Sequence, residues 1–299
     1  MAARPSAPSW RIWGALATVY VVWGSTYLAI RVMVETMPPL LGAGARFTAA
    51  GAVMVGVLSA RRSVRPTRAQ LLSALVVGTL LMGANGVVTI AEQEVPSALA
   101  ALLIASIPLL VIVLRRLAGE RLPRATVAAV LVGFAGVALL VKPGEQSGEA
   151  TVLGLLACVA AAVMWASGSF ASPRVRLPRD PLISTGWQML LGGVVCLAVG
   201  FALGEAPEVD PGAFSVRSLL ALGYLIVFGS WIAFTAYAWL LQNAPISKVS
   251  TYAYVNPVVA IVLGWLILDE VITPIMLVGA AIIVVSVALV VRIEAARRG

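Results

Sequence analysis

Ten apolar segments, each about as long as a membrane-spanning helix, run through nearly the whole chain. A helix needs about 20 predominantly apolar residues to cross the hydrocarbon core of a bilayer. The segments cover approximately residues 12–33, 39–60, 69–91, 96–116, 124–141, 151–172, 182–203, 217–241, 248–268 and 273–292. Proline, glycine or charged residues separate them, and proline is tolerated in the first turn of a helix. The sequence therefore predicts an all-α integral membrane protein with ten transmembrane helices.

The composition of the chain excludes an ordinary soluble protein. Of its 299 residues, 61% are hydrophobic and 11% are charged, whereas about a quarter of the residues of a soluble domain are charged. So much apolar surface requires a lipid bilayer as part of the surroundings. The net charge of +8 does not indicate nucleic-acid binding, because the basic residues lie in short loops and not on a solvated face with aromatic side chains.

Basic residues gather at one set of helix ends. That set holds 17 of the 21 Lys and Arg residues, namely Arg4, Arg11, Arg61, Arg62, Arg65, Arg68, Arg115, Arg116, Arg121, Arg124, Arg174, Arg176, Arg179, Lys248, Arg292, Arg297 and Arg298. The other set carries Lys142, Arg217 and ten acidic residues, namely Glu35, Glu92, Glu94, Glu145, Glu149, Glu205, Glu208, Asp210, Asp269 and Glu270. Loops rich in Lys and Arg stay in the cytoplasm. Both termini are therefore expected there, in a multi-pass protein of a bacterial-type inner membrane.

Short matches recur in the same order in the two halves of the chain. They are Trp23-Gly24-Ser25 with Trp165-Ala166-Ser167, Pro39 with Pro181, Pro96 and Pro108 with Pro245 and Pro257, Glu120 with Glu270, and Val137-Ala138-Leu139 with Val287-Ala288-Leu289. They indicate two copies of a five-helix unit, residues 1–143 and 144–299. Because five is odd, the second copy is inverted in the membrane. Inverted repeats are typical of secondary transporters, which bind substrate where the halves meet. One chain holds both halves, so a monomer is expected to function.

The predicted ninth helix carries the most informative polar residues. Lys248, Tyr252 and Asn256 follow one another at intervals of four and would share one face of an unbroken helix. Together they could bind a carboxylate and offer further hydrogen bonds. Structural roles without substrate binding stay open for all three: Lys248 reaches the membrane interface, Tyr252 belongs to an interfacial belt, and Asn256 makes a helix–helix hydrogen bond.

The other candidate binding residues are polar or aromatic and lie within predicted helices. They are Trp23, Tyr27, Asn85, Trp165, Ser169, Phe234 and Tyr237. Trp23 and Trp165 occupy equivalent places in the two halves and would form either the wall of a small-molecule cavity or part of an interfacial belt. Asn85 is flanked by Gly83 and Gly86, which either open room for a ligand or permit tight helix packing.

Several absences narrow the chemistry. The chain has no His, and its two cysteines, Cys158 and Cys196, lie within apolar segments without a CxxC motif, so metal and haem sites lack ligands. There is no phosphate-binding GxxxxGK[ST] loop and no nucleophile–base pair of a membrane protease. We expect no cofactor and no enzymatic activity. No acidic residue lies deep in an apolar segment, which favours transport down the substrate's own gradient and leaves Lys248 and Glu92 as candidates for proton coupling.

Two related passages carry a resemblance to a known family. One runs from Tyr254-Val255-Asn256-Pro257-Val258-Val259-Ala260 through Gly264-Trp265 to Asp269-Glu270, and the other from Ile107-Pro108-Leu109 to Gly119-Glu120. With these and Trp23-Gly24-Ser25, the chain resembles EamA-type ten-helix members of the drug/metabolite transporter superfamily and, within it, YddG-like exporters of aromatic and neutral amino acids. The resemblance implies a central cavity lined by helices 1, 3, 4, 6, 8 and 9, with helices 5 and 10 at the periphery.

These observations lead to one functional hypothesis with defined rivals. The expected function is export of aromatic or neutral amino acids, or similar small metabolites, by alternating access and without ion coupling. A proton-coupled drug or metabolite exporter is the alternative. A carrier of phosphorylated solutes would need several buried cations, and only Lys248 and Arg46 are available. A non-transporting sensor would need an output domain, for which the chain has no room.

Overall fold

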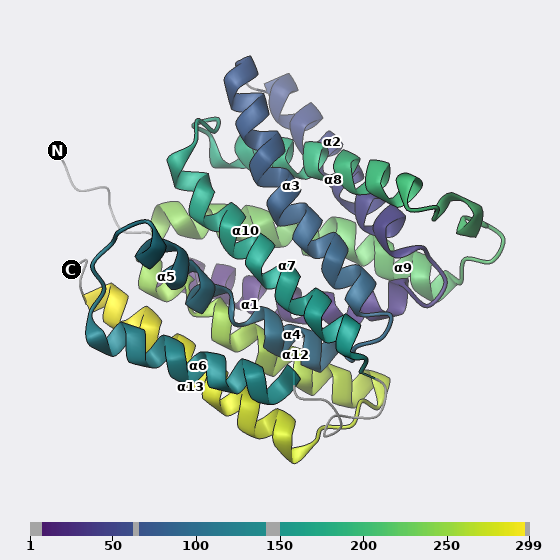
Figure 1. Cartoon of the computed structure of the whole chain (residues 1–299). Coiled ribbons are helices and arrows are strands. Elements are labelled where there is room, and N and C mark those ends of the chain that lie inside the picture. Colours follow the sequence, from purple (N-terminus) through teal and green to yellow (C-terminus); the bar gives the residue numbers. More distant parts are fainter. Residues whose placement is uncertain (1–7, 62–65, 142–149, 297–299) are drawn as a thin grey trace.

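The computed structural model describes residues 8–61, 66–141 and 150–296, and over these ranges the chain is helical, without strands. Figure 1 shows the helices packed into one bundle. The elements are α1 (Ser9–Met33), α2 (Pro39–Arg61), α3 (Arg68–Ala91), α4 (Ser97–Ile104), α5 (Ile107–Leu117), α6 (Arg124–Val141), α7 (Val152–Ala171), η1 (Ser172–Arg174), α8 (Pro181–Ala202), η2 (Ala206–Glu208), α9 (Val216–Tyr224), η3 (Leu225–Ile232), α10 (Ala233–Asn243), α11 (Ile246–Val249), α12 (Tyr252–Leu268) and α13 (Pro274–Ala296).

The predicted membrane spans are confirmed. In the described ranges nine helical stretches are long and apolar enough to cross a bilayer, and the tenth, Tyr252–Leu268, is apolar but shorter. The bundle surface is correspondingly apolar: Leu131, Leu153 and Leu220 are 65%, 74% and 70% exposed. Such residues would be a liability in water and are expected where lipid is the solvent.

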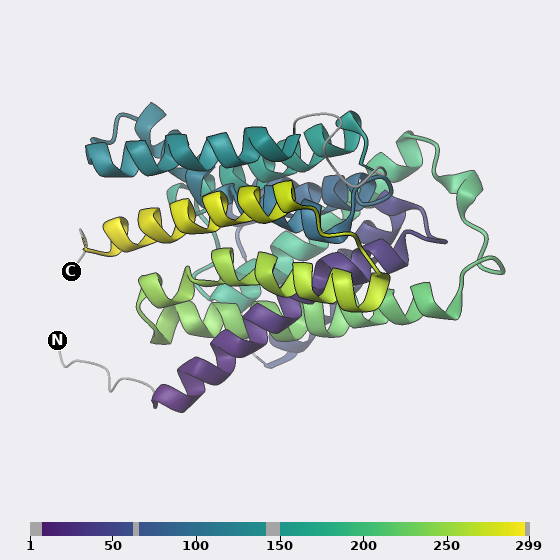
Figure 2. The same ribbon diagram turned by 90° about the horizontal axis from the view of Figure 1, so that it is seen from below.

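The two halves cross the membrane in opposite senses. α1 begins and α13 ends at one end of the bundle, which we call the terminal end, whereas α7, the first helix of the second half, begins at the other, distal end (Figure 2). Helices pair across the halves, α2 and α3 with α8, α3 with α7, α1 with α12, and α6 with α13. The expected inverted five-helix repeats are thus present. The side of the membrane on which the terminal end lies stays a prediction.

Parts of two predictions fall outside the described residues. The expected boundary between residues 143 and 144 lies within 142–149. The same holds for eight of the charges that predicted the orientation: Arg4, Arg62, Arg65, Lys142, Glu145, Glu149, Arg297 and Arg298.

Close backbone approach fixes how the first half meets the second. A Cβ at Gly51 of α2 would collide with the backbone of Leu190 in α8, and one at Gly193 of α8 would lie 2.5 Å from the backbone nitrogen of Thr48. Only glycine allows helices to approach this closely, and small residues drive helix association in membranes where lipid is as apolar as the side chains. This contact sets the rotation of α2, and hence which of its side chains face inward.

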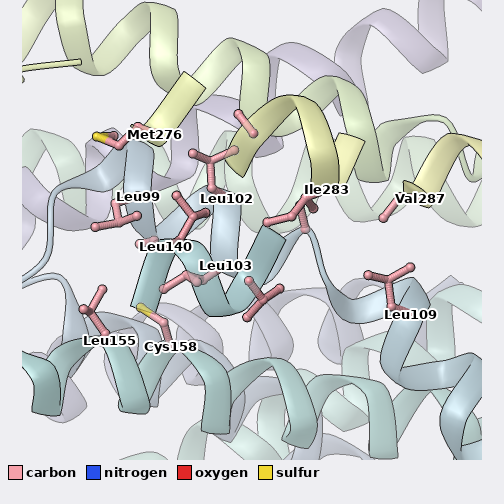
Figure 3. Packing of buried hydrophobic residues seen from close by; sticks show 14 of the residues in the cluster. Leu99, Leu102, Leu103, Leu109, Leu140, Leu155, Cys158, Met276, Ile283 and Val287 are labelled. Carbon is pink, nitrogen blue, oxygen red and sulfur yellow. The ribbon is translucent and has the colours of Figure 1, made fainter. Parts of the chain in front are cut away.

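The largest buried apolar cluster surrounds α4. Figure 3 shows side chains of α6, α7 and α13 around the fully buried Leu99, Leu102 and Leu103 of α4, with Leu109 of α5 at one edge of the cluster. The α4 residues from Ser97 to Leu103 are all buried, so this apolar helix packs against protein and does not face lipid. Cys158 of α7 packs in the same cluster as a small apolar side chain. This packing holds the short, buried α4 in place beside the centre of the bundle.

Three predicted helices depart from a regular α-helix, and two of them are interrupted. The fourth breaks between α4 and α5, where the Ser106 hydroxyl donates to the Leu103 carbonyl at 2.6 Å, just ahead of Pro108. The eighth is continuous but contains the π-helical segment η3. The ninth breaks between α11 and α12, because the Thr251 hydroxyl donates to the Lys248 carbonyl at 2.5 Å and the local backbone bonds tighten to three-residue turns.

The break in the ninth helix corrects one expectation. Lys248 lies in α11, whereas Tyr252 and Asn256 lie in α12. The three residues therefore do not share one face of an unbroken helix.

Candidate substrate cavity

A cavity of about 110 Å³ lies at the centre of the bundle, between the two halves. Side chains from α1, α2, α3, α4, α5, α7, α10 and α12 line it, whereas α6 and α13 contribute none of its described lining. This volume exceeds by severalfold the roughly 10–15 Å³ that one water molecule needs, so a small organic molecule could be accommodated. The helices implied by the family resemblance all contribute, and α2 is an addition to them.

Seven of the residues selected from the sequence line this cavity. They are Trp23, Tyr27, Asn85, Trp165, Phe234, Tyr252 and Asn256. The other three lie elsewhere. Tyr237 packs behind the wall, Ser169 is half-buried in α7, and Lys248 is exposed at the terminal end, with its Nζ 5.9 Å from the centroid of the Trp13 ring. Whether any of the ten contacts substrate stays a prediction.

Trp23 organises one wall of the cavity. Its ring centroid lies 5.0 Å from that of Phe234, 5.1 Å from that of Tyr237 and 5.3 Å from that of Tyr252. Aromatic pairs in tilted or edge-to-face geometry add stabilisation beyond the area that they bury. The indole Nε1 donates to the Gly229 carbonyl at 3.3 Å, within the π-helical segment η3. Trp23 is therefore held in place on both its apolar and its polar edges.

Two amides add polar groups to the aromatic wall. The Asn85 Nδ2 donates to the Leu81 carbonyl at 3.2 Å. The Asn256 Oδ1 is buried and accepts no hydrogen bond from the described residues. Buried polar atoms normally have partners, so an unpartnered acceptor on a cavity wall is a natural contact for a ligand N–H or O–H donor.

Sequence reasoning left Arg46 out of the candidate set, yet this residue also lines the cavity. The Arg46 side chain is 3% exposed, its Nε donates to the Ser230 Oγ at 3.1 Å, and its guanidinium carbon lies 4.5 Å from the centroid of the Phe47 ring. The available signal was a cation in the middle of an apolar segment, because such residues are costly in a membrane and usually functional. Its inward direction, however, depends on the rotation of α2 against α8.

Two carboxylates fasten the halves together at the distal end. Glu270, after α12, accepts hydrogen bonds from the backbone N–H groups of Ser97 and Ala98, the first two residues of α4, at 2.7 and 3.0 Å. Glu205, after α8, likewise accepts from the backbone N–H groups of Leu40 and Leu41 in the first turn of α2, at 3.1 and 2.8 Å. The first N–H groups of a helix lack intrahelical partners and attract negative charge. Each carboxylate thus joins the second half to the first.

Comparison with known proteins agrees with this architecture. A model of the "EamA-like transporter family" matches residues 9–142 and 152–292, which are nearly the whole chain. The "Uncharacterized inner membrane transporter YedA" of Escherichia coli K12 is 38% identical over 281 residues, covering 93% of this chain and 90% of the relative.

More distant relatives and a solved structure extend over similar lengths. The "Uncharacterized transporter YvbV" of Bacillus subtilis is 29% identical, covering 92% of this chain and 90% of its own. "Protein PecM" of Dickeya dadantii is 30% identical, covering 88% and 86%. A crystal structure with 27% identity matches 98% of this chain and 99% of its own, with a TM-score of 0.64. The chain therefore belongs to the EamA-like transporter family of the drug/metabolite transporter superfamily, and is a multi-pass inner-membrane transporter.

Proposed function

We propose that this transporter exports aromatic and other neutral amino acids, or similar small metabolites, by alternating access and without ion coupling. The observation that carries the proposal is the central cavity, in which aromatic side chains meet a few polar groups. Trp23 and Trp165 stand at equivalent places in the two halves and both line the cavity. Flat aromatic faces with sparse, fixed polar groups suit a small organic molecule with an apolar body.

The inverted repeat supplies the mechanism. Substrate bound between the halves would be exposed to one side and then the other as the halves rock. The cross-half contacts at the distal end, through Glu205 and Glu270, are discrete links that can form in one state and open in the other. Because both halves lie in one chain, a monomer is the proposed functional unit.

The cavity charge speaks against a carrier of phosphorylated solutes. Among the described lining residues Arg46 is the single charged one, whereas recognition of a phosphate dianion usually employs several Arg or Lys side chains. One cation suits one negative charge.

Proton-coupled export is a second candidate, favoured by Glu92. Both carboxylate oxygens of Glu92 are buried and accept no hydrogen bond from the described residues. Glu92 follows the span Arg68–Ala91, and burial raises the pKa of its carboxyl well above the ordinary range, with Glu270 adding to the rise and Arg31 opposing it. The titratable and charged groups around it are Tyr27 and Arg31 of α1, Arg46 of α2, Cys158 of α7, and Glu270 after α12. Such a carboxyl can gain or lose a proton as its surroundings change.

Uptake into liposomes tests the proposal. Purified protein would be reconstituted in liposomes loaded with unlabelled L-phenylalanine, and uptake of labelled L-phenylalanine followed without an ion gradient or ATP. We expect saturable uptake that internal substrate stimulates. Trp23→Ala should lower it strongly, whereas Trp265→Ala, which removes a lipid-facing ring that is 56% exposed, should not. The absence of uptake across a panel of neutral amino acids would contradict the proposal.

The same liposomes separate the two candidates. Uptake that appears only with an imposed pH gradient, and that Glu92→Gln abolishes, would favour proton coupling. Uptake that is unchanged by the pH gradient and by Glu92→Gln would exclude it.

A further inference from the structure

The wall of the cavity holds a buried cation that forms no ion pair with a carboxylate in the part of the chain that the structure describes. Arg46 lies within α2, is 3% exposed, and is the one charged residue among the described cavity-lining residues. Within the described part of the chain it makes no ion pair with a carboxylate, and its partners are the Ser230 hydroxyl and the face of the Phe47 ring. A guanidinium has five N–H donors, and Ser230 takes one of them.

The surroundings of Arg46 are built to hold the guanidinium in this place. Ser230 and the neighbouring Gly229 belong to the π-helical segment η3, a type of insertion that is frequent at functional sites. A Cβ at Gly229 would lie 3.1 Å from the Arg46 Nη2, so glycine leaves the space that the guanidinium needs. The guanidinium carbon also lies over the Phe47 ring, 4.5 Å from its centroid, in a cation–π contact.

An uncompensated charge at this depth has a large cost. Removing an ion from water is expensive unless an opposite charge and further hydrogen bonds replace the water, and membrane-embedded cations are retained chiefly for function. A hydroxyl and an aromatic face replace only part of the hydration of a guanidinium. The natural source of the missing negative charge is the molecule that enters the cavity.

We propose that Arg46 binds a carboxylate of the transported molecule, so that the substrate class is small monocarboxylates, amino acids included, whose apolar body lies against the aromatic wall. The inference rests on the proposed transport through this cavity and narrows its substrate. A planar carboxylate matches the two parallel donors of a guanidinium. The unpartnered Oδ1 of Asn256 is available on the same cavity wall for a donor group such as an ammonium.

A rival source of negative charge within the chain is Glu92. This carboxyl is fully buried, lacks hydrogen-bond partners among the described residues, and lies within electrostatic range of Arg46. It is not among the residues that line the cavity. If Glu92 were the counter-ion, removing both charges together would restore what removing Arg46 alone destroys.

Binding of matched probes to the purified full-length protein tests the inference independently of transport. The probes are L-phenylalanine, 3-phenylpropionate and 3-phenylpropanamide, of which the last replaces the carboxylate by an uncharged amide of similar shape. Quenching of tryptophan fluorescence reports binding, because Trp23 and Trp165 line the cavity. We expect the wild type to bind 3-phenylpropionate about 10- to 100-fold more tightly than the amide, the range typical of a charged hydrogen-bonded contact.

Variants identify the residue responsible. Arg46→Gln should abolish the preference for the acid while changing amide affinity less than about threefold. Arg46→Lys keeps the charge but loses the paired N–H donors of the guanidinium, and should retain part of the preference. Arg217→Gln, which removes an exposed cation at the distal end, serves as the control and should keep the full preference. Size-exclusion chromatography checks that each variant is folded, and Arg46→Lys carries the test if Arg46→Gln does not fold.

The outcomes separate this inference from the proposed function. Equal binding of acid and amide by the wild type, no binding of either, or an unchanged preference in Arg46→Gln and Arg46→Lys would overturn it. Restoration of the preference in the double variant Arg46→Gln/Glu92→Gln would also overturn it. The charge of Arg46 would then be needed to neutralise Glu92 and not to bind the substrate. Arg46-dependent binding of acids without any liposomal uptake would support the carboxylate site and contradict transport of these molecules.

Discussion

The two ends of the bundle are fastened by different chemistry. At the distal end the buried carboxylate of Glu205 and the half-buried carboxylate of Glu270 each accept two backbone N–H groups at a helix start. At the terminal end Arg115 pairs with Glu294 at 2.5 Å and with Glu120 at 2.7 Å, and Arg174 pairs with Glu120 at 3.2 Å. Exposure differs as well, since the Arg174 and Glu120 side chains are 44% and 37% exposed.

This difference indicates that the terminal end opens more easily than the distal end. Hydrogen bonds to charged groups away from water contribute roughly 1.5–3 kcal/mol, whereas exposed ion pairs contribute about 0–1 kcal/mol. Glu120 and Glu270 occupy corresponding places in the internal repeat, yet one makes ion pairs and the other caps a helix. A carrier with two related halves must break their symmetry in each of its states, and these two glutamates are where this structure does so.

Replacing Glu270 with alanine should have the largest effect on the comparison. The backbone N–H groups of Ser97 and Ala98, both in fully buried residues, would lose their acceptor. We expect the free energy of unfolding to fall by about 2–4 kcal/mol, because unsatisfied buried donors carry their whole desolvation cost. Thermal unfolding in detergent measures this. Glu35→Ala, which removes an exposed acid at the same end, is the control, and an equal loss in both variants would contradict the account.

Replacing Glu205 with glutamine should have the next largest effect. The amide keeps the size of the side chain but offers one acceptor oxygen to two donors and no charge to the start of α2. A loss of about 1–2 kcal/mol is expected from unfolding measurements. The exposed neighbour Glu208 provides the matched variant Glu208→Gln, which should be neutral. A neutral Glu205→Gln would show that the distal caps do not stabilise the bundle.

Replacing Glu294 with glutamine should have a smaller effect. Its ion pair with Arg115 is partly sheltered, the two side chains being 13% and 16% exposed. We expect a loss of about 1 kcal/mol. The loss should change little between low and high salt, because salt screens sheltered pairs weakly. A loss larger than that of Glu270→Ala would reverse the order of the two ends.

Replacing Arg174 with alanine should have the smallest effect. Its pair with Glu120 is exposed, and its guanidinium also lies 3.6 Å from the centroid of the Phe170 ring. A double-mutant cycle between Arg174→Ala and Glu120→Ala should give a coupling energy of at most about 0.5 kcal/mol that vanishes at high salt. A coupling energy as large as the effect of a distal cap would remove the difference between the two ends.

Much of the fold could be predicted from the sequence because length and hydropathy determine helices in a bilayer. The ten apolar segments and the matched motifs around Trp23 and Trp165 correspond to spans and repeats in the structure. The breaks could not be predicted from hydropathy, since the hydroxyls of Ser106 and Thr251 terminate local helical bonding through short hydrogen bonds that no apolar average reports.

The site was predictable only in part, for related reasons. Trp23 and Asn256 line the cavity, as their depth and polarity suggested. Lys248 is exposed outside the cavity. Its predicted alignment with Tyr252 and Asn256 assumed an unbroken helix, whereas the helix is interrupted after Val249. Arg46 was passed over because its inward direction follows from the glycine-mediated contact of α2 with α8, for instance at Gly51, and not from its own neighbours in sequence.

The most direct test of the central claim, that substrate occupies the cavity between the halves and is exposed to each side in turn, is labelling of a single cavity cysteine. Ala253 lines the cavity and is half-buried, so Ala253→Cys should be tolerated. The native Cys158 and Cys196 are buried and should react little, which the wild type would confirm. We predict that a membrane-impermeant thiol reagent labels Cys at 253 from either side of oriented vesicles, and that L-phenylalanine protects it from both. Labelling from one side only, or labelling that substrate does not slow, would contradict the account.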